Sequence, residues 1–186
     1  YISRGMAHRD NGELERAVED YSEAISLDRQ NARIYNRRGQ VHFDRGDTDA
    51  AVSDYSKAIR IDPDFAQAYV NRGAAHSNRG DHDDAIKDYE EVVRLRPKDT
   101  AGYYHCGRAY ERCGRFEQAL ENYSELIRMR PEYASGYRNR ARVHQSLRDF
   151  TAAISDYTNA IALDPGNATT FNHRGEAHFE QGDTRK

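Results

Sequence analysis

A small residue recurs every 34 positions along this chain, and its surroundings repeat with it. If each unit is numbered so that this residue takes position 8, the series is Gly5, Gly39, Gly73, Gly107, Ala141 and Gly175. A unit of this length cannot bury an apolar face by itself, so neighbouring units must stack to fold stably. Stacking therefore sets the architecture, and the surface that stacking leaves open carries the function.

Four further columns keep the same period. Position 4 is aromatic, position 20 is alanine, position 24 is tyrosine, and position 32 is mostly proline. The residues are Tyr1, Tyr35, Tyr69, Tyr103, Tyr137 and Phe171; Ala17, Ala51, Ala85, Ala119 and Ala153; Tyr21, Tyr55, Tyr89, Tyr123 and Tyr157; and Arg29, Pro63, Pro97, Pro131 and Pro165.

Each half of a unit has residues spaced three or four apart, which predicts two amphipathic helices per unit. In the second unit these include Ile34, Arg38 and Val41 in the first half and Val52, Tyr55 and Ile59 in the second. Glycine followed by aspartate separates the two helices, and Asp-Pro closes the unit, because the residue before proline avoids helical geometry. The first helix of each unit, helix A, is predicted at 32–44, 66–78, 100–112 and 134–146, and the second, helix B, at 47–61, 82–95, 116–129 and 150–163.

This pattern resembles the tetratricopeptide repeat (TPR), which has an aromatic residue, Leu-Gly, Tyr, Ala, a second aromatic residue and Pro at these offsets. The resemblance implies an all-α fold, a right-handed α-solenoid of antiparallel helix pairs with A helices on the concave face and B helices outside. It predicts a single array over residues 1–186, with an N-terminally truncated repeat at 1–31, repeats at 32–65, 66–99, 100–133 and 134–167, and helix A of a sixth repeat, in the place of a cap, at 168–186.

The composition suits a stack of small interfaces better than one large core, because 32% of the residues are charged and the mean hydropathy is -1.03. The sequence has no apolar run long enough for a membrane span and no signal-peptide pattern, so we expect a cytoplasmic protein without a membrane partner. Tyr1 already stands at position 4 and Lys186 closely follows the sixth helix A. Both ends are therefore expected to be truncated, with a signal or a further domain beyond them, and exposed repeat ends favour self-association.

Neither the cysteines nor the histidines predict a metal or a cofactor. Cys106 and Cys113 lie about 10 Å apart along one predicted helix, which excludes a disulfide between them. Histidines at position 11 of stacked repeats lie on the order of 10 Å apart, too far to share a metal ion. We interpret them as neutral packing groups, whose protonation predicts a loss of stability below about pH 6. These histidines are His8, His42, His76, His144 and His178.

Position 7 carries arginine where the family usually has leucine, and position 23 carries aspartate. Only the fourth repeat has lost both, with Cys106 and Asn122 in their place. Because a partly buried guanidinium needs a carboxylate, the joint loss predicts an Arg–Asp pair inside each repeat, with a structural role. The arginines are Arg4, Arg38, Arg72, Arg140 and Arg174, and the aspartates are Asp20, Asp54, Asp88 and Asp156.

Charge is sorted between the two kinds of helix. The A segments of the first five repeats sum to +8 and the five B segments to -13. With A helices on the concave face, as the resemblance implies, this sorting predicts a basic groove in an acidic shell, suited to an acidic partner.

Positions 2, 5, 6, 9, 12 and 13 of helix A line the groove of such repeats, and here they differ from unit to unit. Arginines at these positions are predicted to attract carboxylates, asparagines to bond the peptide backbone, and Tyr104 to pack peptide side chains. The candidate peptide-binding residues are Asn36, Arg37, Gln40, Val70, Asn71, Tyr104, Arg108, Arg138, Asn139 and Arg142. The carboxylate clamp of chaperone-binding members is matched only at its central asparagine, Asn71 or Asn139, which argues against a chaperone tail.

The predicted function is a non-catalytic protein–protein interaction scaffold that binds an extended or C-terminal, acidic peptide. The chain has no phosphate loop, nucleophile motif or metal cluster, which argues against an enzyme, but it could be the substrate-docking arm of a larger enzyme whose catalytic domain is absent. Single-stranded nucleic acid would suit Tyr104 among arginines, but a pI of 6.3 and a net charge of -3 disfavour it.

Overall fold

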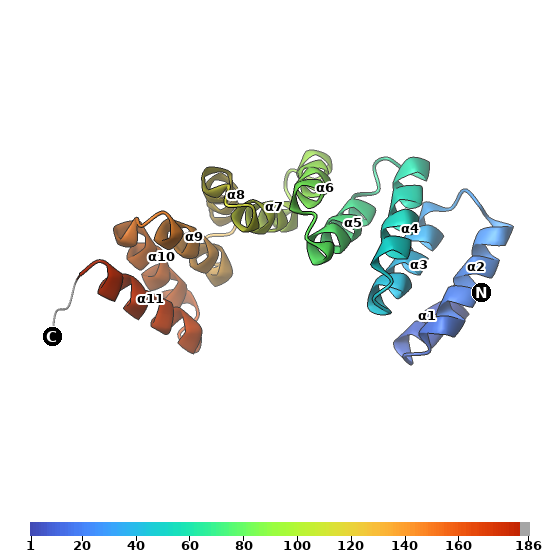
Figure 1. The fold of residues 1–186 in the computed structure, drawn as a ribbon, viewed down its shortest axis with the longest axis horizontal. Coiled ribbons are helices and arrows are strands. Elements are labelled where there is room, and N and C mark those ends of the chain that lie inside the picture. The colour runs from blue at the N-terminus through green and yellow to red at the C-terminus, as the bar shows by residue number, and fades with distance from the viewer. Residues whose placement is uncertain (183–186) are drawn as a thin grey trace. The chain divides into compact units, whose positions relative to one another are not determined.

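The computed structural model describes residues 1–182, and every regular element within them is an α-helix (Figure 1). The predicted all-α fold of antiparallel helix pairs is confirmed. The chain divides into two compact units, Tyr1–Arg96 and Pro97–Lys186, and each unit is described by itself. The single array and its repeat bounds stay a prediction.

The first unit consists of three helix pairs. Within each pair, helix A packs against helix B, and helix B packs against helix A of the next pair. Helices α3 and α5, both A helices, also contact each other. The helices are α1 (Ile2–Asp10), α2 (Leu14–Leu27), α3 (Ala32–Asp44), α4 (Thr48–Ile61), α5 (Ala66–Arg79) and α6 (His82–Leu95).

The second unit continues the same pattern with two pairs and one further A helix. Here α7 contacts α9 and α9 contacts α11, so the A helices again share one side of the unit. The helices are α7 (Thr100–Arg112), α8 (Phe116–Met129), α9 (Ala134–Ser146), α10 (Phe150–Leu163) and α11 (Ala168–Glu180). Predicted and observed bounds agree within one residue from α3 to α10.

The core of each pair is the contact between position 8 and the tyrosine at position 24. A Cβ atom built on Gly39 would lie 2.7 Å from the ring of Tyr55, so the missing side chain is what admits the ring. Tyr55 is 2% exposed and Ala51, one turn earlier, is fully buried. The columns of small residues and tyrosines are therefore two sides of one interface, which explains why they repeat together.

The predicted Arg–Asp pairs are present in four repeats. In the fifth repeat, Arg140 donates from Nε and Nη2 to Asp156 at 2.7 and 2.9 Å. Its Nη1 also donates to Ser124 of the preceding repeat at 3.0 Å. Arg38 and Arg72 make the same two kinds of contact, with Ser22 and Ser56 as the preceding partners. The arginine thus joins successive repeats as well as bracing its own.

Four of the histidines at position 11 stand near a carboxylate of the following turn. Nδ1 of His8 lies 2.7 Å from Glu13, and Nδ1 of His42 lies 3.8 Å from Asp47. His76 and His144 have equivalent carboxylates at 3.8 and 3.7 Å. The loss of stability below about pH 6 stays a prediction.

Acid is also expected to destabilise the protein below about pH 4, through carboxylates that are paired in the fold. A hydrogen bond from Arg4 lowers the pKa of Asp20, and hydrogen bonds from Arg16 and His8 lower that of Glu13. A pKa lowered by folding contributes stability that is present above the unfolded-state pKa and is lost as the pH falls through the folded-state value. Circular dichroism melts should give a Tm that falls as the pH drops below about 4. A Tm that stays constant from about pH 5 down to about 3 would contradict the contribution of these carboxylates.

Candidate functional site

The A-helix side of the first unit carries a polar chain that links two helices. Asn71 on α5 donates from Nδ2 to Oδ1 of Asn36 on α3 at 2.9 Å. Oδ1 of Asn71 in turn accepts from Nε2 of Gln67 at 3.0 Å. The structure therefore brings two predicted site residues together, and Asn36 is buried between the helices. Val70, the neighbour of Asn71 on α5, is partly exposed.

A cavity of about 430 Å³ lies against α3, and three predicted residues line it. Arg33, Asn36, Arg37 and Gln40 follow one another at helical spacing, so they face one side of α3, and Phe65 closes the cavity from the loop before α5. Neither Arg33 nor Arg37 forms an ion pair with a described residue. The cavity thus combines two uncompensated positive charges, two amides and one aromatic ring.

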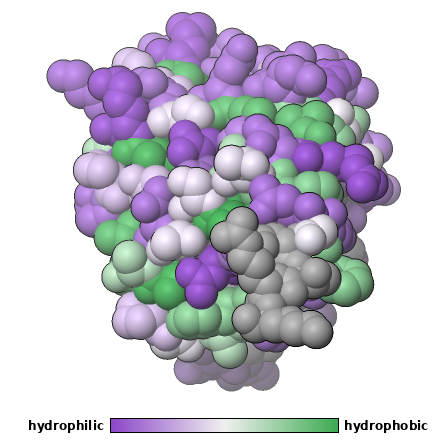
Figure 2. Space-filling view, turned by 90° about the vertical axis from the view of Figure 1, so that its left-hand side faces the viewer, coloured by the Kyte–Doolittle hydropathy of each residue, from purple (hydrophilic) through white to green (hydrophobic). Residues whose placement is uncertain are grey.

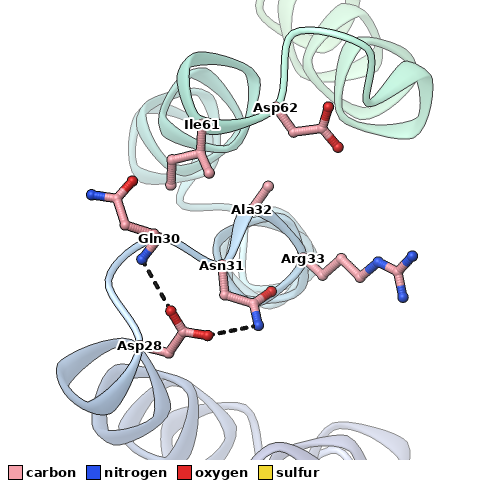
Figure 3. Close-up of a pocket in the computed structure, with 7 residues that line it drawn as sticks. All are labelled: Asp28, Gln30, Asn31, Ala32, Arg33, Ile61 and Asp62. Atoms are coloured by element: carbon pink, nitrogen blue, oxygen red, sulfur yellow. Dashed lines mark hydrogen bonds between the residues drawn. The ribbon is translucent and has the colours of Figure 1, made fainter.

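A second cavity of the first unit, about 470 Å³, is lined by Asp28, Gln30, Asn31, Ala32, Arg33, Ile61 and Asp62 (Figure 3). The polar groups at its centre are already used in the turn. Asp28 accepts hydrogen bonds from the backbone amide of Gln30 at 3.2 Å and from Nδ2 of Asn31 at 3.1 Å. Arg33 points away from this cluster, towards the other side of α3 (Figure 3). We therefore assign this cavity to the loop structure.

In the second unit the structure brings together Tyr104 and Arg108. The Arg108 guanidinium lies 5.6 Å from the centre of the Tyr104 ring, which also meets the ring of Tyr133 edge-on at 6.4 Å. Arg138 donates to Ser135 at 2.9 Å and is partly exposed. Asn139 is only 6% exposed, so little of it is available to a ligand.

Arg142 was predicted to attract a carboxylate of the ligand, but it is bound within the protein. Its Nε and Nη2 donate to the two oxygens of Glu111 at 2.7 and 2.8 Å, and Glu111 also accepts from the hydroxyl of Tyr123 at 3.0 Å. Burial and the Glu111 carboxylate raise the pKa of Tyr123, which therefore stays a neutral donor. Glu111 stands 31 residues before Arg142, and only stacking brings the two together.

The neighbouring cavity of the second unit also disfavours an acidic ligand. It measures about 350 Å³, and two glutamates, Glu176 and Glu180, stand on its α11 side. Its other lining residues are Arg142, Gln145, Ser146, Tyr157 and His173. Because Arg142 is neutralised by Glu111, the charge facing this cavity is predominantly negative.

Within residues 1–182, no group of three or more metal-binding side chains converges on one point. Within the same residues, neither Cys106 nor Cys113 takes part in a disulfide. Over the same range, none of the helices combines the length and apolarity that a membrane span needs.

Comparisons with known proteins match the repeats along almost the whole chain. A TPR repeat model matches residues 5–46 and 39–80. One tetratricopeptide repeat model matches residues 66–99, and another matches residues 104–168 and 138–184. The chain belongs to the tetratricopeptide repeat family. A search of curated proteins found no significant match.

Solved structures of this family share the fold at low sequence identity. MamA matches with a TM-score of 0.83 and 21% identity, over 91% of this chain and 99% of its own. YrrB, described as a TPR protein with an unusual peptide-binding site, matches with a TM-score of 0.82 and 20% identity over 94% and 90%. A tetratricopeptide repeat protein from Parabacteroides merdae matches with a TM-score of 0.87 and 16% identity, over 97% of this chain and 72% of its own. These TPR proteins show the solenoid fold, and the repeats support a protein–protein interaction scaffold, a class that is typically non-catalytic.

Proposed function

We propose that this TPR protein is a non-catalytic scaffold that binds an extended acidic peptide along α3 of its first unit. The observation that supports this most is the cavity at Arg33, Asn36, Arg37, Gln40 and Phe65. Two guanidiniums without internal partners would attract carboxylates, and the amides would bond the backbone of an extended chain. Phe65 would pack against an apolar side chain of the peptide.

By the same reasoning, we expect the second unit to contribute less to peptide binding than the first. Arg108 and Arg138 remain available to carboxylates, with Tyr104 as a packing surface beside them. Arg142 is excluded from ligand binding in this proposal, because releasing it would leave Glu111 unpaired in a partly buried place. The proposal therefore moves the main contact from the fourth and fifth repeats, which hold the candidate residues Arg108, Arg138 and Arg142, to the second.

Substituting Arg33 and Arg37 with glutamate is expected to weaken acidic peptide binding roughly tenfold or more, because attraction becomes repulsion. The probe is a phage-displayed peptide library that is selected on the wild-type chain at physiological salt. We expect the selected peptides to be enriched in Asp and Glu. Selected peptides are then synthesised, and their Kd is measured by fluorescence anisotropy at several salt concentrations. The wild-type Kd should rise steeply with salt.

Arg60→Glu on α4 is the matched control, because Arg60 is an exposed arginine on a B helix. It changes the net charge like each groove substitution but should leave the Kd nearly unchanged. Peptides that lack acidic residues, or an equal loss of binding in the Arg60 variant, would contradict the proposal. Arg138→Glu tests the second unit, and a smaller effect than at Arg37 is expected.

A further inference from the structure

The cavity against α3 is lined by hydrogen-bond donors that the protein leaves unused. Arg33 and Arg37 stand one helical turn apart, so both guanidiniums can reach one group of a ligand from the same side of α3. Neither arginine has a hydrogen-bond or ion-pair partner among the described residues. Because a guanidinium only donates hydrogen bonds, these two side chains call for a ligand group that is rich in acceptor oxygens.

A chain of hydrogen bonds fixes the orientation of Asn36, which lines the same cavity. Oδ1 of Asn71 accepts from Nε2 of Gln67 at 3.0 Å, so Nδ2 of Asn71 is the group that donates to Asn36, at 2.9 Å. Oδ1 of Asn36 is thereby used as an acceptor, and its Nδ2 keeps donors without a partner in the described part of the chain. Asn36 is only 5% exposed, so packing holds this amide in place.

The N-terminal end of α5 adds positive potential to the cavity. Phe65 is the N-cap residue of α5 and one of the residues that line the cavity. No side chain caps this end of α5 by a hydrogen bond, and its first turn contains no acidic residue. Because the N-terminus of a helix carries a partial positive charge, an anion in the cavity would be stabilised by it.

Two carboxylates lie close to this site, but both are used in turns. Asp28 and Asp62 line the adjacent cavity, to which Arg33 also contributes (Figure 3). Asp28 accepts hydrogen bonds within its own turn, and Asp62 accepts one from the backbone amide of Asp64 at 3.2 Å. Neither forms an ion pair with Arg33, which points away from Asp28 (Figure 3). The arginine therefore keeps its charge for a ligand.

The cavity described in the second unit has the opposite character. It carries Glu176 and Glu180 on α11, and its one arginine, Arg142, is neutralised by Glu111. Figure 2, which views the molecule from the side that carries α11, shows hydrophobic residues dispersed among hydrophilic ones. A strongly anionic ligand group is therefore expected at the cavity of the first unit.

We propose that the cavity against α3 takes a phosphorylated side chain, phosphoserine or phosphothreonine, of the extended peptide, so that phosphorylation of the partner strengthens binding. This inference rests on the proposed function. A carboxylate has one charge and would leave one of the two guanidiniums without a counter-charge. A phosphate monoester has about two charges and three terminal oxygens, which match two guanidiniums and the fixed amide of Asn36.

The probes are three fluorescein-labelled peptide pools with a central phosphoserine, glutamate or serine and degenerate flanking residues. Fluorescence anisotropy at physiological salt measures the Kd of each pool for the 186-residue chain. We expect the phosphoserine pool to bind roughly tenfold tighter than the glutamate pool, because it engages both guanidiniums and the amide. The serine pool should bind most weakly.

Two variants separate phosphate recognition from simple charge attraction. The double variant Arg33→Lys, Arg37→Lys keeps both charges but loses the planar guanidiniums that bind two oxygens at once. The preference for phosphoserine over glutamate should fall to about twofold or less, and the Kd of the glutamate pool should change little. Asn36→Asp removes the amide donors and should abolish the preference, while Asn71 can still donate to the new carboxylate. Arg60→Lys on α4 is the matched control and should leave the preference unchanged.

A phosphoserine pool that binds no tighter than the glutamate pool would overturn this inference and leave the proposed function standing. If none of the three pools binds, both fall. A preference that survives in the double lysine variant and in Asn36→Asp would place the phosphate elsewhere and also overturn the inference. So would phosphatidylcholine vesicles containing a phosphoinositide that bind more tightly than the phosphoserine pool, because the site would then serve a lipid headgroup.

Discussion

Replacing Gly107 with leucine is expected to destabilise the second unit by about 3 kcal/mol, near the upper end of overpacking effects. A Cβ atom at Gly107 would lie 2.6 Å from Cε1 of Tyr123, and the remaining leucine carbons would extend further into the same ring. Tyr123 cannot move aside cheaply, because it is fully buried and its hydroxyl donates to Glu111. Urea denaturation followed by circular dichroism would show the change as a lower midpoint.

Gly175→Leu is the matched control, and the expected change in stability has the opposite sign. Both glycines stand at position 8 of an A helix, but a Cβ atom built on Gly175 meets no atom of a described residue within 4 Å. The leucine gains helix propensity there, so α11 should be stabilised by roughly 0.5 to 1 kcal/mol. Slower amide hydrogen exchange in α11 would report this. Equal destabilisation at both positions would contradict the proposed role of the tyrosine contact.

Ala141 shows how large a side chain position 8 accepts in the fifth repeat. The fifth repeat has alanine there, fully buried against Tyr157, so one methyl group fits when the ring is placed for it. Gly107→Ala should therefore cost much less than Gly107→Leu. A steep dependence on side-chain size is the expected signature of a close-packed contact.

Replacing Arg140 with methionine is expected to destabilise the protein by about 2 to 3 kcal/mol, because it leaves a buried carboxylate without its partner. The Asp156 side chain is only 6% exposed. We expect less destabilisation than for breaking a fully buried ion pair, because 23% of the Arg140 side chain is exposed to solvent. Thermal and urea unfolding measure the loss, and the Ser124 contact between repeats is lost with it.

The fourth repeat supplies the control for this prediction. It carries Cys106 and Asn122 at the two positions, and Asn122 donates to the backbone carbonyl of Gln118 at 2.9 Å. The double variant Arg140→Cys, Asp156→Asn should therefore recover at least about 1 kcal/mol relative to Arg140→Met, because no charge is stranded. If the double variant is as unstable as the single one, the pair acts through packing and not through charge.

The helices and their order follow from the sequence because they depend on local periodicity, repeated several times in register. The Arg–Asp pairs were predictable for a similar reason, since both residues disappear together in the fourth repeat. The serine that completes each bridge was missed, although Ser22, Ser56, Ser124 and Thr158 form a column at position 25. Nothing in the sequence alone says that this column faces the arginine of the next repeat.

The candidate site was predictable only in part. Arg37 and Gln40 line a cavity with Asn36, as their register indicates. Arg142 looks equivalent by register but is bound to Glu111. Arg33 stands at groove position 2, as its register indicates, whereas Phe65 lies outside the predicted groove positions. Charge counting treats all arginines alike, whereas availability to a ligand depends on which carboxylates lie nearby.

The amino-acid sequence by itself determined the repeat, the helix pairs and the membership of the TPR family, because a recurring pattern of small, aromatic and apolar residues specifies local helices and the faces they bury. Only the tertiary structure decided which arginines remain unpaired and which glycine has open space beside it. Those properties depend on distances between residues 16 to 35 positions apart. Helix pairing within a repeat brings Arg140 to Asp156, and stacking between repeats brings Asn71 to Asn36.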